Sequence, residues 1–166
     1  MAREQVMGYR IGIITVSDTR NESTDFSGPA IENALKKIGF QKFEKRLVKD
    51  ETIAIRNAIL ELCENCDAIF TTGGTGFMSR DVTPEATLTL IEKRAQSLET
   101  MILISGLQKT PFAGLSRGVI GVRGKTLIVN LPGSPKGAQE GTEALKDCLV
   151  HILNQINDIS HEDEVN

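Results

Sequence analysis

The chain has 166 residues, about the length of one domain, and at that size burial of apolar surface can stabilise a fold without disulfides or metals. Hydrophobic residues make up 40% and charged residues 25%, with a formal net charge of −3, which is typical of a globular protein. With a near-neutral charge balance, no Trp and one Tyr, the chain lacks the basic surface and stacking platforms of nucleic-acid-binding proteins.

The three cysteines are an odd number and form no framework of the kind found in secreted proteins. Residues 1–10 contain no apolar signal-peptide core, and no stretch is long and apolar enough to span a membrane. We therefore expect a cytoplasmic protein that binds neither nucleic acid nor membrane.

The first half of the chain alternates apolar, β-branched runs with helical stripes. A strand is predicted over 11–16, and apolar residues at helical spacing predict a helix over 31–38 that ends at Gly39. A less regular strand over 43–48 precedes a helix over 52–66. The third strand, 67–72, leads directly into a glycine-rich loop.

The second half continues the alternation. Thr83-Pro84-Glu85 predicts a helix start, because it combines a hydroxyl N-cap, Pro at the first helical position and an acid in the first turn. A helix over 98–105, strands over 119–122 and 126–131, and one long amphipathic helix over 145–156 follow.

This order predicts a single α/β domain over 1–157, a three-layer fold with a mostly parallel sheet and helices on both faces. We expect the acidic tail, 158–166, to be disordered.

Small and polar residues gather in three loops that follow predicted strands, 17–28, 73–83 and 130–137. Ligands of such sheets bind beyond the carboxyl ends of the strands. Gly73, Gly74 and Gly76 suit a concave set of N–H groups for an anion, although a tight strand-to-helix turn explains them as well. The loop is not a Walker A motif, because no Gly-Lys-Ser/Thr sequence follows the glycines. It is not a dinucleotide-binding fingerprint either, because Ser79 stands where that motif has its third glycine.

Two acids lie near these loops, Asp50 after the second predicted strand and Asp81 after the glycines. Mg²⁺ binds through one or two carboxylates together with waters and substrate phosphates, so this pair suits a magnesium–phosphate site. Each acid also has a purely structural interpretation, Asp50 as a helix cap and Asp81 as a turn former. Arg80 and Lys136 are candidates for offsetting phosphate charge.

The cysteines and histidines lie outside these three loops in the sequence. Cys63 and Cys66 form a CxxC on an apolar helical stripe, and no second cysteine pair completes a zinc site, so core packing is favoured. His151 falls in the last predicted helix and His161 in the tail, away from all three loops. A histidine nucleophile or general base is therefore not expected.

The glycine loop and the segment that follows it carry a family resemblance. The chain resembles the MogA/MoaB family of molybdenum cofactor biosynthesis, in particular the MogA-type molybdopterin adenylyltransferases and the G domain of gephyrin. The matching segments are Thr15–Thr19, Asp25 with Ser27-Gly28-Pro29, Val48–Glu51, Thr71–Gly76, Arg80–Thr87, Thr110-Pro111, Leu115-Ser116-Arg117 and Gly124–Ser134.

The resemblance implies transfer of AMP: the terminal phosphate of molybdopterin attacks the α-phosphate of ATP and pyrophosphate leaves. It implies that Asp50 and Asp81 are the catalytic acids and the Mg²⁺ ligands. It also implies a substrate site formed by residues of all three loops, namely Ser17, Asp18, Asp25, Ser27, Gly28, Gly73, Gly74, Thr75, Gly76, Asn130, Pro132, Gly133 and Ser134. A homotrimer and contact with a molybdenum-insertion protein are implied as well.

Two positions, one segment and the spacing to Pro111, which is one residue longer, depart from the family pattern. Phe26 stands where a basic residue is common, Ile102 where Arg is common, and 93–97 lacks the usual acid-x-Pro-Gly sequence. A molybdopterin-binding or scaffold protein without transferase activity is an alternative, suggested by the resemblance to MoaB-type relatives and by the scaffolding role of gephyrin. An unrelated nucleotide-binding, flavodoxin-like domain is the weaker one.

Overall fold

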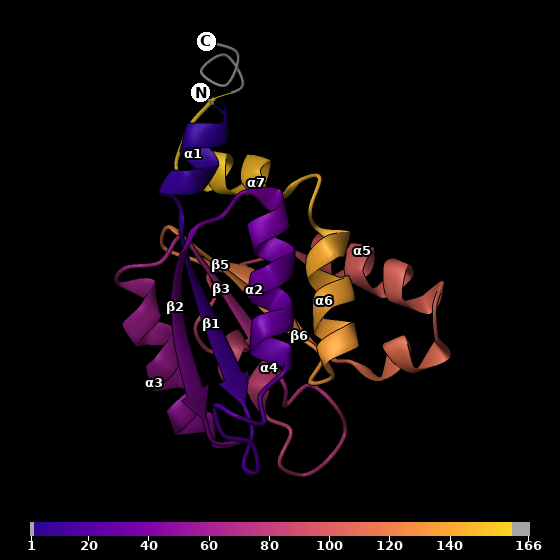
Figure 1. Ribbon diagram of the computed structural model, residues 1–166. Coiled ribbons are helices and arrows are strands. Elements are labelled where there is room, and N and C mark those ends of the chain that lie inside the picture. The colour runs from indigo at the N-terminus through magenta and orange to yellow at the C-terminus, as the bar shows by residue number, and fades with distance from the viewer. Residues whose placement is uncertain (1, 161–166) are drawn as a thin grey trace.

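The computed structural model describes residues 2–160 (Figure 1). The described strands form one six-stranded sheet in the order β2-β1-β3-β6-β5-β4. β2, β1, β3 and β6 are parallel, whereas β5 is antiparallel to β6 and β4 to β5. The strands are β1 (Arg10–Val16), β2 (Lys42–Val48), β3 (Ala68–Thr72), β4 (Lys93–Arg94), β5 (Ile120–Arg123) and β6 (Thr126–Leu131).

Helices cover both faces of this sheet. α2 and α6 cover the face turned toward the viewer in Figure 1, and α3 and α4 cover the opposite face. The helices are α1 (Ala2–Gly8), α2 (Ser27–Ile38), α3 (Thr52–Cys63), α4 (Thr83–Leu88), α5 (Gln96–Leu107), α6 (Pro135–Ala144) and α7 (Leu149–Ile156), with a 3₁₀ turn, η1 (Pro111–Leu115). The predicted α/β class and the mostly parallel sheet are confirmed.

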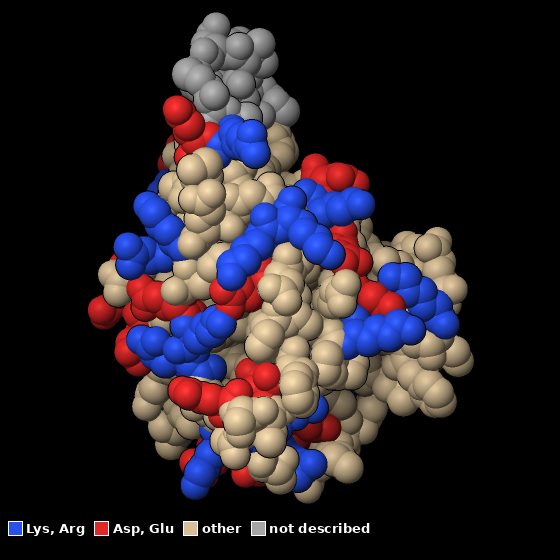
Figure 2. Space-filling view, viewed as in Figure 1, with Lys and Arg blue, Asp and Glu red and all other residues tan. Residues whose placement is uncertain are grey.

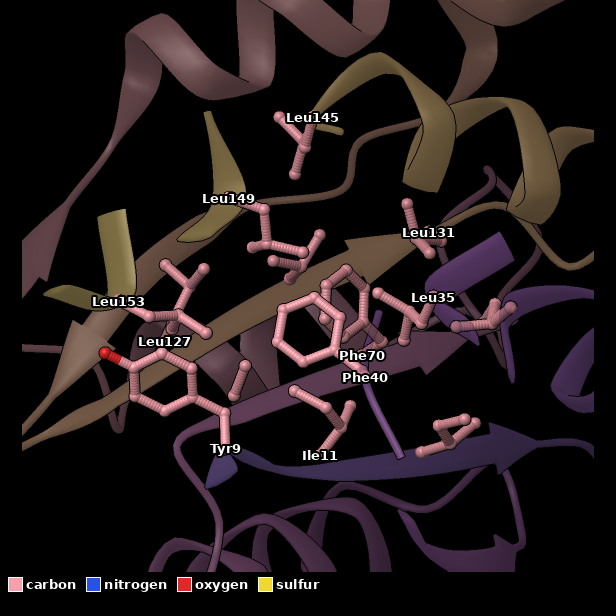
Figure 3. Packing of buried hydrophobic residues seen from close by; sticks show 14 of the residues in the cluster. Tyr9, Ile11, Leu35, Phe40, Phe70, Leu127, Leu131, Leu145, Leu149 and Leu153 are labelled. Carbon is pink, nitrogen blue, oxygen red and sulfur yellow. The ribbon is translucent and has the colours of Figure 1, made fainter. Parts of the chain in front are cut away.

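The alternation of side chains along the strands divides the core into two clusters. Ile13 and Phe70 belong to the cluster under α2, α6 and α7, whereas Ile14 and Ile69 belong to the cluster under α3 and α4. Successive strand residues point to opposite faces, so strands covered on both faces are apolar throughout. Figure 3 shows the larger cluster, with Phe70 at its centre.

The predicted long helix over 145–156 is wrong. The chain turns at residues 145–148, where the N–H of Cys148 donates to the Leu145 carbonyl, and α7 begins only at Leu149. The leucines of the predicted stripe are buried as expected, but from a turn and a short helix. Figure 3 shows Leu145, Leu149 and Leu153 over the sheet.

Helix α6 was not predicted, because its buried positions are small. Only Ala138, Gly141 and Thr142 are buried, so no apolar stripe marks it. A Cβ on Gly141 would lie 2.6 Å from Leu131 Cδ2, and the glycine therefore lets the helix approach β6 closely.

The tail prediction concerns residues 158–166, of which 161–166, including His161, lie outside the described residues. Lys125 Nζ donates to the Ile156 carbonyl at 2.9 Å and pairs with the Asp158 carboxylate. Among the described helices, none has the length and hydropathy needed to cross a bilayer.

Candidate active site

The glycine loop leaves the end of β3 in a conformation that only glycine adopts easily. Gly73 has φ 98° and Gly74 has φ 69°, both in the left-handed region. A Cβ on Gly73 would lie 2.3 Å from the Val16 carbonyl oxygen. The start of α4 holds the loop, because Thr83 donates from Oγ1 to the Gly73 carbonyl at 2.9 Å and from its N–H to the Gly74 carbonyl at 3.0 Å.

This loop presents unused donors. The N–H groups of Gly74, Thr75 and Gly76 donate no hydrogen bond to any residue between 2 and 160. Successive backbone N–H groups in such a turn form an anion-binding concavity. The anion-binding interpretation of the glycines therefore has a physical basis beyond their sequence spacing.

Both predicted acids lie against this loop. Asp81 Oδ2 is 2.8 Å from the position of a Cβ on Gly76, and Asp50 Oδ1 is 3.3 Å from that of a Cβ on Gly74. Asp81 Oδ2 also accepts from the Met78 N–H at 2.9 Å, so Asp81 is the turn former that its sequence context indicates. The sheet thus brings together two carboxylates that lie far apart in the sequence.

Asp50 is held by Asp18 rather than by a helix. The Asp18 N–H donates to Asp50 Oδ2 at 3.0 Å, and the Asp50 N–H donates to Asp18 Oδ1 at 2.9 Å. The residue before α3 is Glu51, whose side chain makes no capping bond, so the helix-cap interpretation of Asp50 is wrong. The reciprocal pair ties the loop after β1 to the loop after β2.

Burial raises the pKa of Asp50, and the charges of Asp18 and Asp81 raise it further. The hydrogen bond from the Asp18 backbone and the charge of Arg80 act against them, but the pKa stays above its usual value. The two neighbouring carboxylates destabilise the anionic form of Asp50, and a cation close to Asp50 would stabilise that form. Arg80 alone does not offset this negative charge.

The loop after β1 supports the N-terminus of α2. Asp25 Oδ1 accepts from the N–H groups of Ser27 and Gly28 at 3.0 and 3.1 Å, and its Oδ2 accepts from Thr15 Oγ1 at 2.7 Å. Ser27 Oγ donates to the Gly133 carbonyl at 2.7 Å. Asp25 and Ser27 therefore form hydrogen bonds within the protein. The bond from Ser27 to Gly133 joins the first predicted loop to the third.

Arg20 reinforces this junction and was not predicted. Its Nη1 donates to Ser27 Oγ at 2.8 Å and to the Gly133 carbonyl at 3.2 Å. Its position three residues after Ser17, within a predicted ligand loop, was the available signal. Ser17 Oγ in turn accepts from the Arg20 N–H at 3.1 Å.

The third loop lies beside the glycines. Pro132 accepts from Thr72 Oγ1 at 2.6 Å, and Ser134 caps α6 by accepting from the Gly137 N–H at 3.0 Å. Asn130 is buried, and its amide donates to Thr71 and Thr87 and accepts from the Val119 N–H. The side chain of Asn130 therefore fixes β3, α4 and β6 together.

A pocket of about 780 Å³ opens beside the glycine loop. The predicted residues that line it are Gly74, Thr75, Gly76, Asp81, Asn130, Pro132, Gly133 and Ser134. The other predicted site residues do not line it, namely Ser17, Asp18, Asp25, Ser27, Gly28, Asp50 and Gly73. The predicted site is thus divided between this pocket and the adjoining loops.

The far wall of the pocket was not predicted. It comes from β4, α5 and η1, including the segment that departs from the family pattern, through Arg94, Glu99, Ile102, Leu103 and Phe112. Arg94 and Glu99 are joined by two hydrogen bonds of 2.9 and 3.0 Å. Figure 1 shows α5 projecting beyond the edge of the helix layer, and Ile102 packs against the hydrophobic core from this helix.

The cysteines and the described histidine take no part in this site. Burial raises the pKa of Cys66 to about 12 and also raises the pKa of Cys63, as expected for core packing. His151 lies in α7. Within residues 2–160, no three His, Cys, Asp or Glu side chains are arranged to hold a metal ion.

Comparison with known proteins assigns this architecture. Residues 12–151 match the family described as "Probable molybdopterin binding domain". The chain belongs to this family. The resemblance expected from the glycine loop and the Arg80–Thr87 segment is therefore confirmed.

Individual relatives agree with this assignment. The chain is 35% identical over 152 residues to a molybdopterin adenylyltransferase of Helicobacter pylori, covering 88% of this chain and 86% of the relative. It is 38% identical to the molybdenum cofactor synthesis protein cinnamon of Drosophila melanogaster, but covers only 25% of that protein's length. The solved structure of the molybdopterin biosynthesis enzyme MoaB of Thermus thermophilus superposes with a TM-score of 0.83 at 43% identity, covering 90% of this chain and 97% of that one.

Proposed function

We propose that the protein transfers AMP from ATP to the terminal phosphate of molybdopterin in molybdenum cofactor biosynthesis. One observation carries the proposal: two carboxylates, Asp50 and Asp81, lie against a glycine loop with three unused N–H groups. The Helicobacter pylori relative, named molybdopterin adenylyltransferase and aligned over most of both chains, supports the same activity.

The reaction suits a site without a dedicated base. A phosphate oxygen of molybdopterin is already anionic near neutral pH and attacks the α-phosphorus of ATP. The bond from that phosphorus to the bridging oxygen breaks, and pyrophosphate leaves with the electron pair. Such chemistry depends on positioning and on charge stabilisation, and the free N–H groups of Gly74, Thr75 and Gly76 offer both to phosphate oxygens.

We propose that Asp50 and Asp81 also hold a magnesium ion. Each keeps an oxygen, Oδ1, that accepts no hydrogen bond from the described residues. Two carboxylates are too few for a site made of protein alone, but they suit Mg²⁺ completed by waters and substrate phosphates. When bound, the ion would neutralise phosphate charge. The raised pKa of Asp50 agrees with a site that gains from a cation.

The pocket has room for a substrate beside the loop. Its volume of about 780 Å³ lies within the range of small-molecule sites. Asp81 and the glycines form one wall, and Leu103 and Phe112 belong to the apolar opposite wall. We propose that phosphates occupy the glycine side and that a ring system of a substrate lies against the apolar side.

We propose that the protein assembles as a homotrimer. α5 contains no buried residue, although its sequence is largely apolar. Its exposed apolar side chains continue onto η1. Met101, Ile104 and Leu107 do not line the pocket, whereas Leu103, Phe112 and Leu115 do, so the proposed interface adjoins the pocket. An apolar surface of this extent is typical of a protein interface. We also propose a cytoplasmic location, as expected from the sequence, and contact with a molybdenum-insertion protein, as the family resemblance implies.

The role of Asp81 is tested with Asp81→Asn. Adenylylated molybdopterin is measured by chromatography after incubation with molybdopterin, ATP and Mg²⁺. We expect the variant to lose at least about a hundredfold in turnover while keeping its circular dichroism spectrum and its affinity for molybdopterin. Asp158→Asn, which changes an exposed acid at the far end of the chain, serves as the control and should keep full activity.

Full turnover by Asp81→Asn would contradict the role given to this carboxylate. Tight binding of molybdopterin by the wild type without any ATP-dependent product would instead favour the scaffold alternative. Failure to bind molybdopterin at all would contradict both.

A further inference from the structure

Arg117 contacts both the glycine loop and the segment that follows it. It lies between η1 and β5, and its backbone N–H donates to the Thr75 carbonyl at 2.9 Å. Its Nε donates to the Gly76 carbonyl at 2.8 Å, and its Nη2 donates to the Asp81 carbonyl at 3.1 Å. Its Nη1 pairs with the Glu85 carboxylate.

These contacts join the two ends of a loop. The segment from Gly76 to Asp81 leaves the glycine turn and returns to the start of α4, and one guanidinium binds the carbonyl at each end. The same group lies 5.7 Å from the centre of the Phe77 ring. A planar guanidinium carries its donors in a rigid fork, so it fixes both carbonyls relative to each other.

We propose that Arg117 is a positioning residue of the transferase. This inference rests on the proposed function. Arg117 clamps residues 76–81 so that the Asp81 carboxylate faces the unused N–H groups of the glycine loop. It does not act by lending its charge to a phosphate, because each of its guanidinium nitrogens already has an acceptor and Glu85 balances its charge.

Two substitutions separate positioning from charge. Arg117→Lys keeps the positive charge but offers a single point donor in place of the fork, and Arg117→Met removes both. If Arg117 positions the loop, both variants lower kcat to a similar extent, roughly 10- to 100-fold, while KM for ATP changes by less than about threefold. Arg123→Lys is the matched control, because Arg123 donates to the Leu90 carbonyl at 3.1 Å and does not line the pocket.

Near-normal activity of Arg117→Lys beside an inactive Arg117→Met would overturn the proposal, because charge alone would then suffice. A large rise in KM for ATP at unchanged kcat would also overturn it, since that result identifies a substrate-binding residue.

Hydrogen–deuterium exchange tests the clamp without any substrate. The amides of Met78, Asp81 and Thr83 are hydrogen-bonded within the loop and its junction with α4. We expect peptides covering 73–85 to exchange faster in Arg117→Lys than in the wild type, while peptides covering α3 stay unchanged. Unchanged exchange in 73–85, or an equal increase across the whole chain, would overturn the proposal.

This second readout also separates the two claims. If the wild type makes no adenylylated molybdopterin, the proposed function fails. The exchange result would still show whether Arg117 holds the loop.

Discussion

At the scale of single residues, the two acids reach the glycine loop by different routes. Asp81 belongs to the same loop and is fixed by the Met78 N–H three residues away, so a local sequence pattern is enough to predict its place. Asp50 is fixed by Asp18, 32 residues away. That pairing depends on the register of β1 with β2, which pairs Val16 with Val48. A sequence without contact information cannot supply it.

The Asp81 carboxylate lies so close to Gly76 that a side chain at position 76 should disturb it. A Cβ at this position would lie 2.8 Å from Asp81 Oδ2, so Gly76→Ala must displace the carboxylate. Because a displacement of about 1 Å costs up to roughly a hundredfold in rate, we expect turnover to fall by about 10- to 100-fold. Gly8→Ala, where a Cβ would meet nothing within 4 Å, is the control. Wild-type turnover by Gly76→Ala would show that this carboxylate position does not matter.

A second residue-scale prediction concerns Cys66. Burial raises its pKa to about 12, so almost no thiolate is present at pH 8, and only the thiolate reacts. We expect iodoacetamide to leave Cys66 unmodified in the folded protein and to alkylate it fully in denaturant, as measured by peptide mass spectrometry. Rapid labelling of the native protein would contradict the core assignment of the CxxC.

At the scale of elements, the sequence predicted best where apolar spacing is strong. α3 carries Ile55, Ile59 and Leu62 on its buried face. It starts at residue 52 as predicted but ends at Cys63 rather than at residue 66. α5 shows the opposite case: its apolar residues indicate a helix but none is buried, so the pattern did not reveal that this helix forms a pocket wall. α6 was missed because close packing required glycine rather than leucine.

We expect the contact between α2 and β2 to depend on pH. Burial raises the pKa of Glu32, but the hydrogen bonds and charges of Lys36 and Lys45 together lower it by more than burial raises it. The pKa of Glu32 therefore lies below its usual value. A carboxyl group with a lowered folded-state pKa stabilises the fold above its unfolded-state pKa and loses that contribution as the pH falls.

We therefore expect Glu32→Gln to lower the free energy of unfolding by about 0.5–1 kcal/mol at pH 7, since both lysines are about half exposed. The difference from the wild type should shrink toward zero below pH 4. Urea unfolding at the two pH values measures it, with Glu22→Gln, an exposed loop acid, as the control. An equal deficit at both pH values would contradict the ionic origin of the stabilisation.

At the scale of the whole molecule, the alternation of strands and helices predicted the layers, but not the shape of the site. The central strands were predicted because they are apolar on both faces. The pocket was not, since its far wall comes mainly from α5 and η1, which no strand pattern places. Positive and negative side chains alternate over the face shown in Figure 2 without an extended region of one sign.

The apolar face of α5 and η1 predicts self-association. We expect light scattering after size-exclusion chromatography to give three times the mass of one chain. Ile104→Glu, at a position 54% exposed, should give the single-chain mass with an unchanged circular dichroism spectrum. Ile53→Glu, on α3 and 72% exposed, should leave the assembly intact. A single-chain mass for the wild type would contradict the proposed trimer.

The central claim is that this protein transfers AMP to molybdopterin rather than only binding it. The most direct measurement is a single-turnover reaction of the purified wild type with molybdopterin, Mg²⁺ and ATP, in which adenylylated molybdopterin and pyrophosphate are both quantified. We predict that the two products appear together, in equal amounts, and only when ATP is present. Molybdopterin recovered unmodified from a tight complex, with no pyrophosphate released, would contradict the claim and identify a binding protein.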